Sequence, residues 1–488
     1  MENSRYYTKC VTAGRAAEGL RADWQDQLRE LQWEIGFEYI RFHGIFHDDM
    51  GIYQEDENGK PKFYFGYFDK LFDFLLSVGI KPIMEFGFMP SQLATQCGTV
   101  FWWKGNGAPP VDYGKWAELV EATVRHAIDR YGIEEVLTWY FEVWNEPNLG
   151  SFWRGTFEEY CHLYEVSVEA VKKIDVRLRV GGPSTSGADF REDLQWLKNF
   201  IRFCDDKHLP IDFFSAHPYP TYWPLDTEGN KQMGYMKQDS TIQHLSMIRE
   251  IVDQSPYPQA EIHLTEWNSS PSPRDLIHDT MFMAPFILYN ISMNFQKVNS
   301  LGFWTFTDVF EEQGANLYQF HGGFGMMNPS GLKKPSYWAY YFLSKLGDEI
   351  LVADENHLVS RTGDDYCVLI WNYCYYQDAF ALGDRSKLTP LSRNHVFQDK
   401  VETVSFDLDL EGEYEEEVSS LNQDTSVFDN WVAMGAPEYP TKCELDHLKS
   451  ISQPQRSWKR LSIPVGKPYS RQDILQPHEV KMIRLRKK

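Results

Sequence analysis

The sequence predicts an α/β fold, a (β/α)8 TIM barrel followed by a C-terminal accessory β-sandwich domain, and three observations lead to this prediction. The chain has 488 residues, and a single hydrophobic core stops growing at roughly 250–300 residues, so two unequal domains are expected. A helix–glycine–strand unit recurs through the N-terminal two thirds of the chain, and short alternating strands replace it afterwards. We therefore expect a catalytic barrel over residues 1–345 and a β-sandwich over 346–488.

The barrel prediction rests on units in which an amphipathic helix ends at a glycine and a short apolar strand follows. In the first clear unit, apolar residues keep helical spacing from Trp24 to Ile35, and Gly36 ends the helix. Strand candidates lie at 7–12, 39–42, 81–86, 137–143, 178–181, 212–216, 261–265 and 301–306. Eight such strands indicate a TIM barrel. A doubly wound open sheet is the alternative, but no glycine-rich phosphate loop follows the first strand.

The C-terminal region has the pattern of antiparallel β structure. Two alternating segments, 357–360 and 366–371, flank a turn at 363–365, as in a hairpin. This pattern predicts a β-sandwich. The acidic run 411–417 is expected to be a solvated turn or sheet edge without a function of its own.

The composition limits the possible partners and locations. The chain carries 48 basic and 70 acidic residues, a net charge of −22, which argues against nucleic acid or an anionic membrane and favours a neutral ligand. We find no apolar stretch that resembles a signal peptide or a membrane span. The seven cysteines, an odd number without C-x-x-C spacing, indicate reduced thiols. Together these features predict a cytoplasmic protein.

One apolar strand ends abruptly in the sequence Trp-Asn-Glu-Pro-Asn at 144–148. Pro147 cannot donate a hydrogen bond to a continuing strand ladder, so the strand should stop there. Glu146 would then lie at the C-terminal mouth of the barrel, where TIM-barrel enzymes place their chemistry. The alternative is a glutamate in a surface loop.

A second strand, 261–265, ends in the same way at Glu266, beside an aromatic and an amide residue. Glu146 and Glu266 close the fourth and the seventh predicted strands, which lie on opposite sides of a barrel mouth. Retaining glycoside hydrolysis needs two carboxyl groups about 5–5.5 Å apart, one that attacks the anomeric carbon and one that protonates the departing oxygen. The charge of the nucleophile disfavours a second charge nearby, so its partner should hold a proton.

These two motifs, W-N-E-P-N at 144–148 and T-E-W-N at 265–268, resemble glycoside hydrolase family 39, which includes β-xylosidases and α-L-iduronidases. Segments similar to bacterial β-xylosidases occur in order along most of the chain, at 41–53, 85–90, 304–312 and 321–325. The resemblance implies a barrel with an accessory β-sandwich, no cofactor and often a homo-oligomer. One position departs from the pattern: Phe42 stands where the β-xylosidases have glycine, and a side chain there would reshape the sugar pocket.

The same resemblance implies a role for individual residues. Glu146 corresponds to the acid/base, Glu266 to the nucleophile, and Asn145 to the amide that binds the sugar 2-hydroxyl. Further substrate-binding residues implied in this way are His43, His217, Tyr219, Trp304, Glu311 and Glu312. Without the resemblance, His217 and Tyr219 could equally cap the end of a strand, and Glu311 and Glu312 could be a solvated acidic pair.

We therefore expect a retaining, exo-acting glycoside hydrolase that acts on oligosaccharides. The favoured activity is that of a β-xylosidase, which releases xylose from the non-reducing ends of xylo-oligosaccharides during xylan degradation. The alternatives are α-L-iduronidase or another exo-glycosidase of the same family and, from a different class, a non-catalytic carbohydrate-binding protein. No metal site is expected, because the nearby run His43, His47, Asp48 and Asp49 matches no standard zinc or calcium spacing.

Overall fold

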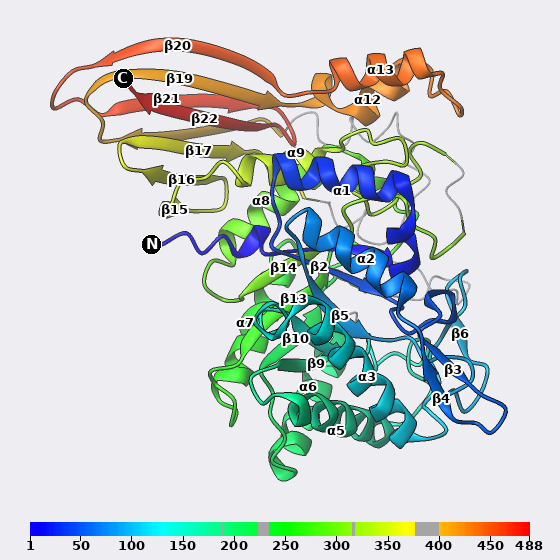
Figure 1. Cartoon of the computed structure of the whole chain (residues 1–488). Helices are drawn as coiled ribbons and strands as arrows, with labels where there is room; N and C mark the ends of the chain where they lie inside the picture. The colour runs from blue at the N-terminus through cyan, green and yellow to red at the C-terminus, as the bar shows by residue number, and fades with distance from the viewer. Residues whose placement is uncertain (188–189, 223–233, 315–317, 376–399) are drawn as a thin grey trace, which may run out of the picture.

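The computed structural model describes residues 1–187, 190–222, 234–314, 318–375 and 400–488, and Figure 1 shows a barrel with a second β-rich region on one side of it. Eight parallel strands close the barrel in the order β1-β14-β13-β10-β9-β8-β5-β2. They are β1 (Cys10–Arg15), β2 (Tyr39–His43), β5 (Lys81–Phe86), β8 (Tyr140–Val143), β9 (Arg179–Ser186), β10 (Phe213–His217), β13 (Glu261–Trp267) and β14 (Ser300–Phe303). The barrel prediction is confirmed, and the open-sheet alternative is wrong, because β1 pairs with both β2 and β14.

Helices follow the strands and cover the outside of the barrel (Figure 1). They are α1 (Ala22–Glu34), α2 (Gly66–Ser77), α3 (Tyr113–Tyr131), α4 (Ile133–Val136), α5 (Phe157–Ile174), α6 (Phe190–Asp206), α7 (Ser240–Asp253), α8 (Met283–Met293) and α9 (Pro335–Leu343). Sequence signals mark their ends: Asp112 caps α3, and Gly132, with a φ of 84°, ends it. In the described part of the chain, no helix is both long and apolar enough to cross a bilayer.

Short two-stranded sheets lie in the loops at the carboxyl ends of the barrel strands. The pairs are β3 (Tyr53–Glu55) with β4 (Pro61–Phe63), β6 (Thr99–Val100) with β7 (Gly105–Asn106), and β11 (Thr221–Tyr222) with β12 (Gly234–Tyr235). The predicted first strand, 7–12, begins too early, because Tyr6–Thr8 form a turn of 3-10 helix before β1.

Strand β2 shows how alternation divides its side chains between the barrel interior and the helix layer. Arg41 is fully buried and bonds to Glu142 of β8, across the barrel interior. Phe42 points the other way, because its ring packs against Phe72 of α2 at a centroid distance of 6.2 Å. Phe42 therefore fills the space between the strand and the helix layer.

The described part of the C-terminal region, residues 346–375 and 400–488, contains two antiparallel sheets. One has the order β15-β16-β17-β22-β19-β20, and the other pairs β18 with β21. The strands are β15 (Glu349–Ala353), β16 (His357–Thr362), β17 (Asp365–Trp371), β18 (Glu402–Leu408), β19 (Gly412–Leu421), β20 (Gln455–Ile463), β21 (Tyr469–Leu475) and β22 (Val480–Lys487). Apolar residues of both sheets, among them Val368, Phe406 and Ile483, form one buried cluster, so the two sheets pack face to face as the predicted β-sandwich requires.

Two features of this region differ from the prediction. Helices α12 (Val427–Ala433) and α13 (Lys442–Ile451) interrupt the β structure. The acidic run at 411–417 is only partly the solvated turn or edge that was expected: Glu411 and Glu413 are exposed, but from Gly412 the run lies in β19, between β22 and β20. Glu416 is only 2% exposed and is paired with Lys459 and Arg471 at 3.0 and 2.9 Å. A lysine on the neighbouring strand β20 and an arginine on β21 of the other sheet therefore neutralise a carboxylate that looks solvated in the local sequence.

A buried ion-pair cluster fixes the loop that precedes α9. The ammonium of Lys334 lies 2.6 Å from Asp279 and 2.5 Å from Asp308, and it donates to the carbonyl of Gly323 at 2.9 Å. All three charged side chains are buried. A Cβ atom on Gly323 would lie 2.3 Å from Asp308, so only glycine lets the loop approach the cluster this closely.

Substitution of this lysine should destabilise the protein strongly. Lys334→Met leaves Asp279 and Asp308 buried without their cation, so the free energy of unfolding should fall by about 3–5 kcal/mol. Lys173→Met is the matched control: Lys173 is 67% exposed and pairs with Glu121 on the surface, so its loss should cost less than about 1 kcal/mol. Chemical denaturation of both variants measures the difference, and equal losses would contradict a structural role for the Lys334 cluster.

Candidate active site

A cavity of about 270 Å³ opens at the carboxyl ends of the barrel strands. Its walls come from the ends of, or the loops after, seven barrel strands, so residues far apart in the chain meet there. The lining residues are His43, Phe101, Asn145, Glu146, Leu149, Phe152, Ser186, Tyr219, Glu266, Pro271, Pro273, Trp304, Glu312, Gln313 and Phe324. Both predicted catalytic glutamates are among them. This edge of the barrel is where TIM-barrel enzymes place their catalytic groups.

A tight backbone turn after β8 aims Glu146 into the cavity. Trp144 and Glu146 have φ angles of 72° and 46°, and this left-handed region costs roughly 1–2 kcal/mol for a residue other than glycine. Hydrogen bonds to β9 compensate. The N–H of Glu146 donates to the carbonyl of Ser184 at 2.9 Å, and the side chain of Asn148 bonds to both backbone groups of Ser186, at 2.9 and 2.8 Å.

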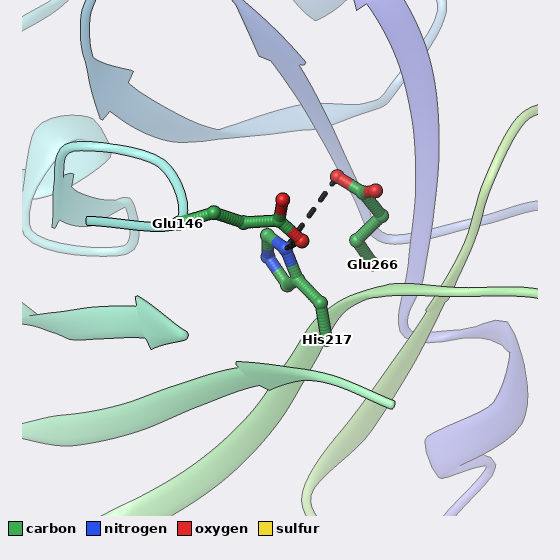
Figure 2. Close-up of side chains that lie close together, drawn as sticks. All are labelled: Glu146, His217 and Glu266. Carbon is green, nitrogen blue, oxygen red and sulfur yellow. Dashed lines mark hydrogen bonds and ion pairs between the residues drawn. The ribbon is translucent and has the colours of Figure 1, made fainter. Parts of the chain in front are cut away.

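Glu146, Glu266 and His217 converge at one place, as Figure 2 shows. One carboxylate oxygen from each glutamate and one ring nitrogen of His217 all lie within 4.8 Å of one another. This spacing fits the separation of about 5–5.5 Å in retaining glycosidases and is shorter than the roughly 6.5–9.5 Å of inverting ones. The predicted convergence of the fourth and seventh strands therefore brings the two carboxyl groups within reach of the same bond.

Two carboxylates and a histidine are also the residue types that bind transition metals. Here their atoms already have protein partners. The guanidinium of Arg41 lies 3.2 Å from one oxygen of Glu266, and the hydroxyl of Tyr219 donates to the other at 2.5 Å. A metal ion would have to displace these donors and sit beside the charge of Arg41, so the donor set does not fit a metal well.

Arg41 is fully buried and does not line the cavity, but it contacts residues that do. Its guanidinium lies 2.8 Å from Glu85, 2.8 Å from Glu142 and 3.2 Å from Glu266. It also donates to the side-chain oxygen of Asn145 at 2.8 Å. The network joins β2, β5, β8 and β13, and it therefore fixes the side chains that surround the two catalytic candidates.

The two glutamates differ in their electrostatic surroundings. Burial raises the pKa of Glu146 well above its ordinary value, and the nearby charge of Glu266 raises it further. Burial also raises the pKa of Glu266, but His43, Arg41 and Tyr219 oppose that effect. Because the contacts with cations and donors favour Glu266, it is the group that ionises first, and Glu146 keeps its proton.

The structure brings five of the seven other predicted site residues to the cavity wall, namely Asn145, His43, Tyr219, Trp304 and Glu312. The ring of His43 lies 4.8 Å from that of Trp304, and its Nδ1 lies 2.6 Å from Glu85. Burial, followed by the charge of Glu266, raises the pKa of Glu312 well above its ordinary value. A neutral Glu312 is both a donor and an acceptor for hydroxyl groups.

The other two predicted residues, His217 and Glu311, lie outside the cavity lining. His217 is fully buried behind Glu146, with its Nδ1 atom 3.0 Å from Oε1 of that residue. The carboxylate of Glu311 is held by Arg15 and Arg21, at 2.7 and 2.9 Å. The structure therefore separates the pair Glu311 and Glu312, with only the second facing the cavity.

Sequence reasoning missed the buried network and the aromatic walls. Arg41, Glu85 and Glu142 each stand between apolar residues inside a short strand, a signal that points to the barrel interior. Phe101 and Phe152 lie in loops, where no periodic pattern marks them. Phe42, expected to reshape the sugar pocket, is not among the lining residues.

Comparisons with known proteins agree with this geometry. The model for the family described as Glycosyl hydrolases family 39 matches residues 2–466. The chain is 38% identical over 453 residues to a β-xylosidase of Geobacillus stearothermophilus, across 90% of this chain and 85% of that protein. It is also 38% identical over 459 residues to a β-xylosidase of Caldicellulosiruptor saccharolyticus, across 92% and 89%. Its fold matches the crystal structure of a monomeric β-xylosidase from Caulobacter crescentus CB15 with a TM-score of 0.89 and 32% identity, over 100% of this chain and 97% of that one.

The raised pKa of Glu146 predicts that its carboxyl group destabilises the folded protein above the ordinary pKa of glutamate, near 4.5. Below that value the folded and unfolded chains both hold the proton. As the pH rises, the unfolded chain releases it first and stability is lost. Glu146→Gln should therefore leave stability unchanged near pH 4 and increase it by at least about 1 kcal/mol near pH 7.

Calorimetric unfolding from pH 4 to 8 measures this difference. Glu118→Gln is the control, since Glu118 is exposed on α3, and it should show no such pH dependence. A Glu146→Gln protein that is equally or less stable than the wild type at every pH would contradict the raised pKa.

Proposed function

Because the chain belongs to glycosyl hydrolase family 39, a family of retaining glycosidases, we propose that it is an exo-acting β-xylosidase of xylan degradation. It releases xylose from the non-reducing ends of xylo-oligosaccharides, with Glu266 as nucleophile and Glu146 as acid/base. The observation that carries this proposal is the approach of these two carboxyl groups within 4.8 Å at the bottom of one cavity. The similarity to two β-xylosidases supports the choice of sugar.

The reaction proceeds in two displacements. In the first, the carboxylate of Glu266 attacks the anomeric carbon while Glu146 gives its proton to the glycosidic oxygen, and the shortened chain leaves. In the second, Glu146, now a carboxylate, takes a proton from water, and that water attacks the anomeric carbon of the ester with Glu266. Each displacement inverts the anomeric centre, so the product keeps the configuration of the substrate.

The cavity wall supplies groups for binding a sugar. The oxygen of the Asn145 amide accepts from Arg41 at 2.8 Å, so its NH2 group is left to donate to a sugar hydroxyl, in agreement with the 2-hydroxyl role implied by the resemblance. His43 and Glu312 can bond to other hydroxyls, and Trp304 offers an apolar face. Both oxygens of Glu311 are bonded to arginines, so we propose that it supports the loop without contacting the sugar.

The cavity favours a neutral sugar over a uronic acid. Among the described residues that line it, none is a lysine or an arginine, and Glu146, Glu266 and Glu312 are all acidic. A substrate carboxylate, as in iduronate, would meet these acids without a cation at the wall to pair with it. α-L-Iduronidase is therefore the weaker candidate. The other alternative, a non-catalytic carbohydrate-binding protein, is also weaker, because sugar binding alone would not need two carboxyl groups so close together.

The location, the domain division and the oligomeric state of the protein are also proposed. We propose a cytoplasmic location, in keeping with seven cysteines that are all free thiols. We propose a domain division at residues 345 and 346, in the segment between the end of α9 at Leu343 and the start of β15 at Glu349. A homo-oligomer is proposed from the family resemblance alone.

A panel of aryl glycosides tests the choice of sugar. The β-xyloside should be hydrolysed with the highest kcat/KM, because the cavity pairs neutral hydroxyls with acidic and amide groups and has no cation for a carboxylate. NMR of the reaction mixture should show β-xylose before mutarotation. Faster hydrolysis of an α-L-iduronide would overturn the proposed substrate, and initial α-xylose would overturn the double displacement.

Azide rescue of two alanine variants tests the separate roles of the glutamates. In Glu146→Ala, an activated aryl xyloside still forms the glycosyl-enzyme, and azide should replace water to give the β-glycosyl azide. In Glu266→Ala, azide should attack the bound substrate directly and give the inverted α-azide. NMR of the two products reads out the roles. An α-azide from Glu146→Ala with a β-azide from Glu266→Ala, or no azide product from either variant, would contradict the assigned roles.

A further inference from the structure

His217 is the predicted site residue whose contacts differ most from those of a sugar-binding group. Its ring is inaccessible to solvent and lies beside the carboxyl group of Glu146 (Figure 2). Its Nδ1 atom lies 3.0 Å from Oε1 of Glu146. Its Nε2 atom lies 3.0 Å from the hydroxyl of Ser184 and 3.1 Å from that of Thr265. Both ring nitrogens are therefore occupied by protein groups.

The hydroxyl of Thr265 determines which ring nitrogen carries the proton. This hydroxyl donates its single hydrogen to Oε1 of Glu142 at 2.7 Å, and the other oxygen of Glu142 accepts from Arg41 at 2.8 Å. With its hydrogen used, the oxygen of Thr265 can only accept from Nε2 of His217. The ring proton consequently lies on Nε2. The oxygen of Ser184, which accepts from Arg41 at 3.2 Å, has a second lone pair and is the other acceptor for this N–H.

His217 carries only that one proton. Burial lowers its pKa well below the ordinary value, and the charges of Arg41 and His43 lower it further. The other groups in contact with the ring are Ser184 of β9, Thr265 and Glu266 of β13, and Glu146 in the turn after β8. Glu146 also feels the charges of Asp193 on α6 and of Glu312 in the loop after β14. The Nδ1 atom lies 3.7 Å from the nearer oxygen of Glu266, too far for a hydrogen bond. A neutral ring with its proton on Nε2 presents a lone pair from Nδ1 to Glu146.

We propose that His217 is a positioning residue that holds Glu146 in its protonated form, through a relay that runs from Arg41 through Glu142, Thr265 and His217. This inference rests on the proposed role of Glu146 as acid/base. The lone pair on Nδ1 accepts the proton of the carboxyl group and so stabilises its neutral form. The reverse tautomer would donate to the carboxylate and stabilise the charged form.

The relay acts at both steps of the proposed reaction. In the first step, the carboxyl group of Glu146 rotates about its Cγ–Cδ bond, so its O–H turns away from Nδ1 and towards the glycosidic oxygen. The proton passes to that oxygen, whose bond to the anomeric carbon breaks as the bond from the anomeric carbon to Glu266 forms. The resulting carboxylate of Glu146 then faces the lone pair of Nδ1. This repulsion raises its basicity and favours removal of a proton from the attacking water, which restores the carboxyl group.

The alkaline limb of the pH profile of kcat/KM for phenyl β-xyloside tests the relay, since this limb reports the pKa of the general acid in the free enzyme. Thr265→Val removes the acceptor for Nε2–H, which lets the ring proton move to Nδ1 and donate to Glu146. The limb should shift to lower pH by about one unit, the equivalent of one hydrogen bond. Thr265→Ser keeps the hydroxyl and should restore the wild-type limb.

A purely structural defect would not give this pattern. The shift should be absent with 2,4-dinitrophenyl β-xyloside, whose leaving group needs no proton. An unmoved limb in a folded Thr265→Val protein, or the same shift in Thr265→Ser, would overturn the relay. If Thr265→Val does not fold, Ser184→Ala is the second test, because it removes the other acceptor of Nε2–H. The alkaline limb should then shift in the same direction by a smaller amount, and an unmoved limb would overturn the relay. A Glu146→Gln protein with wild-type rate and limb would instead overturn the proposed role of Glu146.

Discussion

The guanidinium of Arg41 is buried among the carboxylates of Glu85, Glu142 and Glu266, and the rest of the cavity depends on this arrangement. A buried cation must be compensated by close acceptors, and buried carboxylates need the cation in return. The ends of β2, β5, β8 and β13 are therefore held in one arrangement. Glu266 receives part of the positive charge and ionises, whereas Glu146, which the guanidinium does not contact, keeps its proton.

Those parts of the fold and the site that local sequence patterns encode could be predicted. Helical spacing that ends at a glycine, followed by an apolar strand, gave the correct barrel and the correct order of its strands. Glu146 and Glu266 were predicted because each ends an apolar strand, and parallel strands in a barrel bring their carboxyl ends to the same edge. The sequence resemblance added the residues around them, of which Asn145 and Trp304 line the cavity.

What the sequence did not reveal depends on contacts between distant segments. The carboxylate partners of Arg41 lie about 45 to 225 residues further along the chain. No local sequence pattern can therefore show this network. The different surroundings of Glu311 and Glu312 depend on Arg15, at the end of β1, and Arg21, just before α1. The helix α13 did have a local signal, the capping box of Thr441 and Glu444, but the surrounding β pattern obscured it.

The proposed mechanism requires two carboxyl groups that act in different protonation states on one glycosidic bond. Incubation with an activated 2-deoxy-2-fluoro-β-xyloside tests it directly, because the fluorine slows hydrolysis of the covalent intermediate more than its formation. Peptide mapping by mass spectrometry should find one fluorosugar attached to Glu266. A label on Glu146 or Glu312, or complete inactivity without any label, would contradict the account.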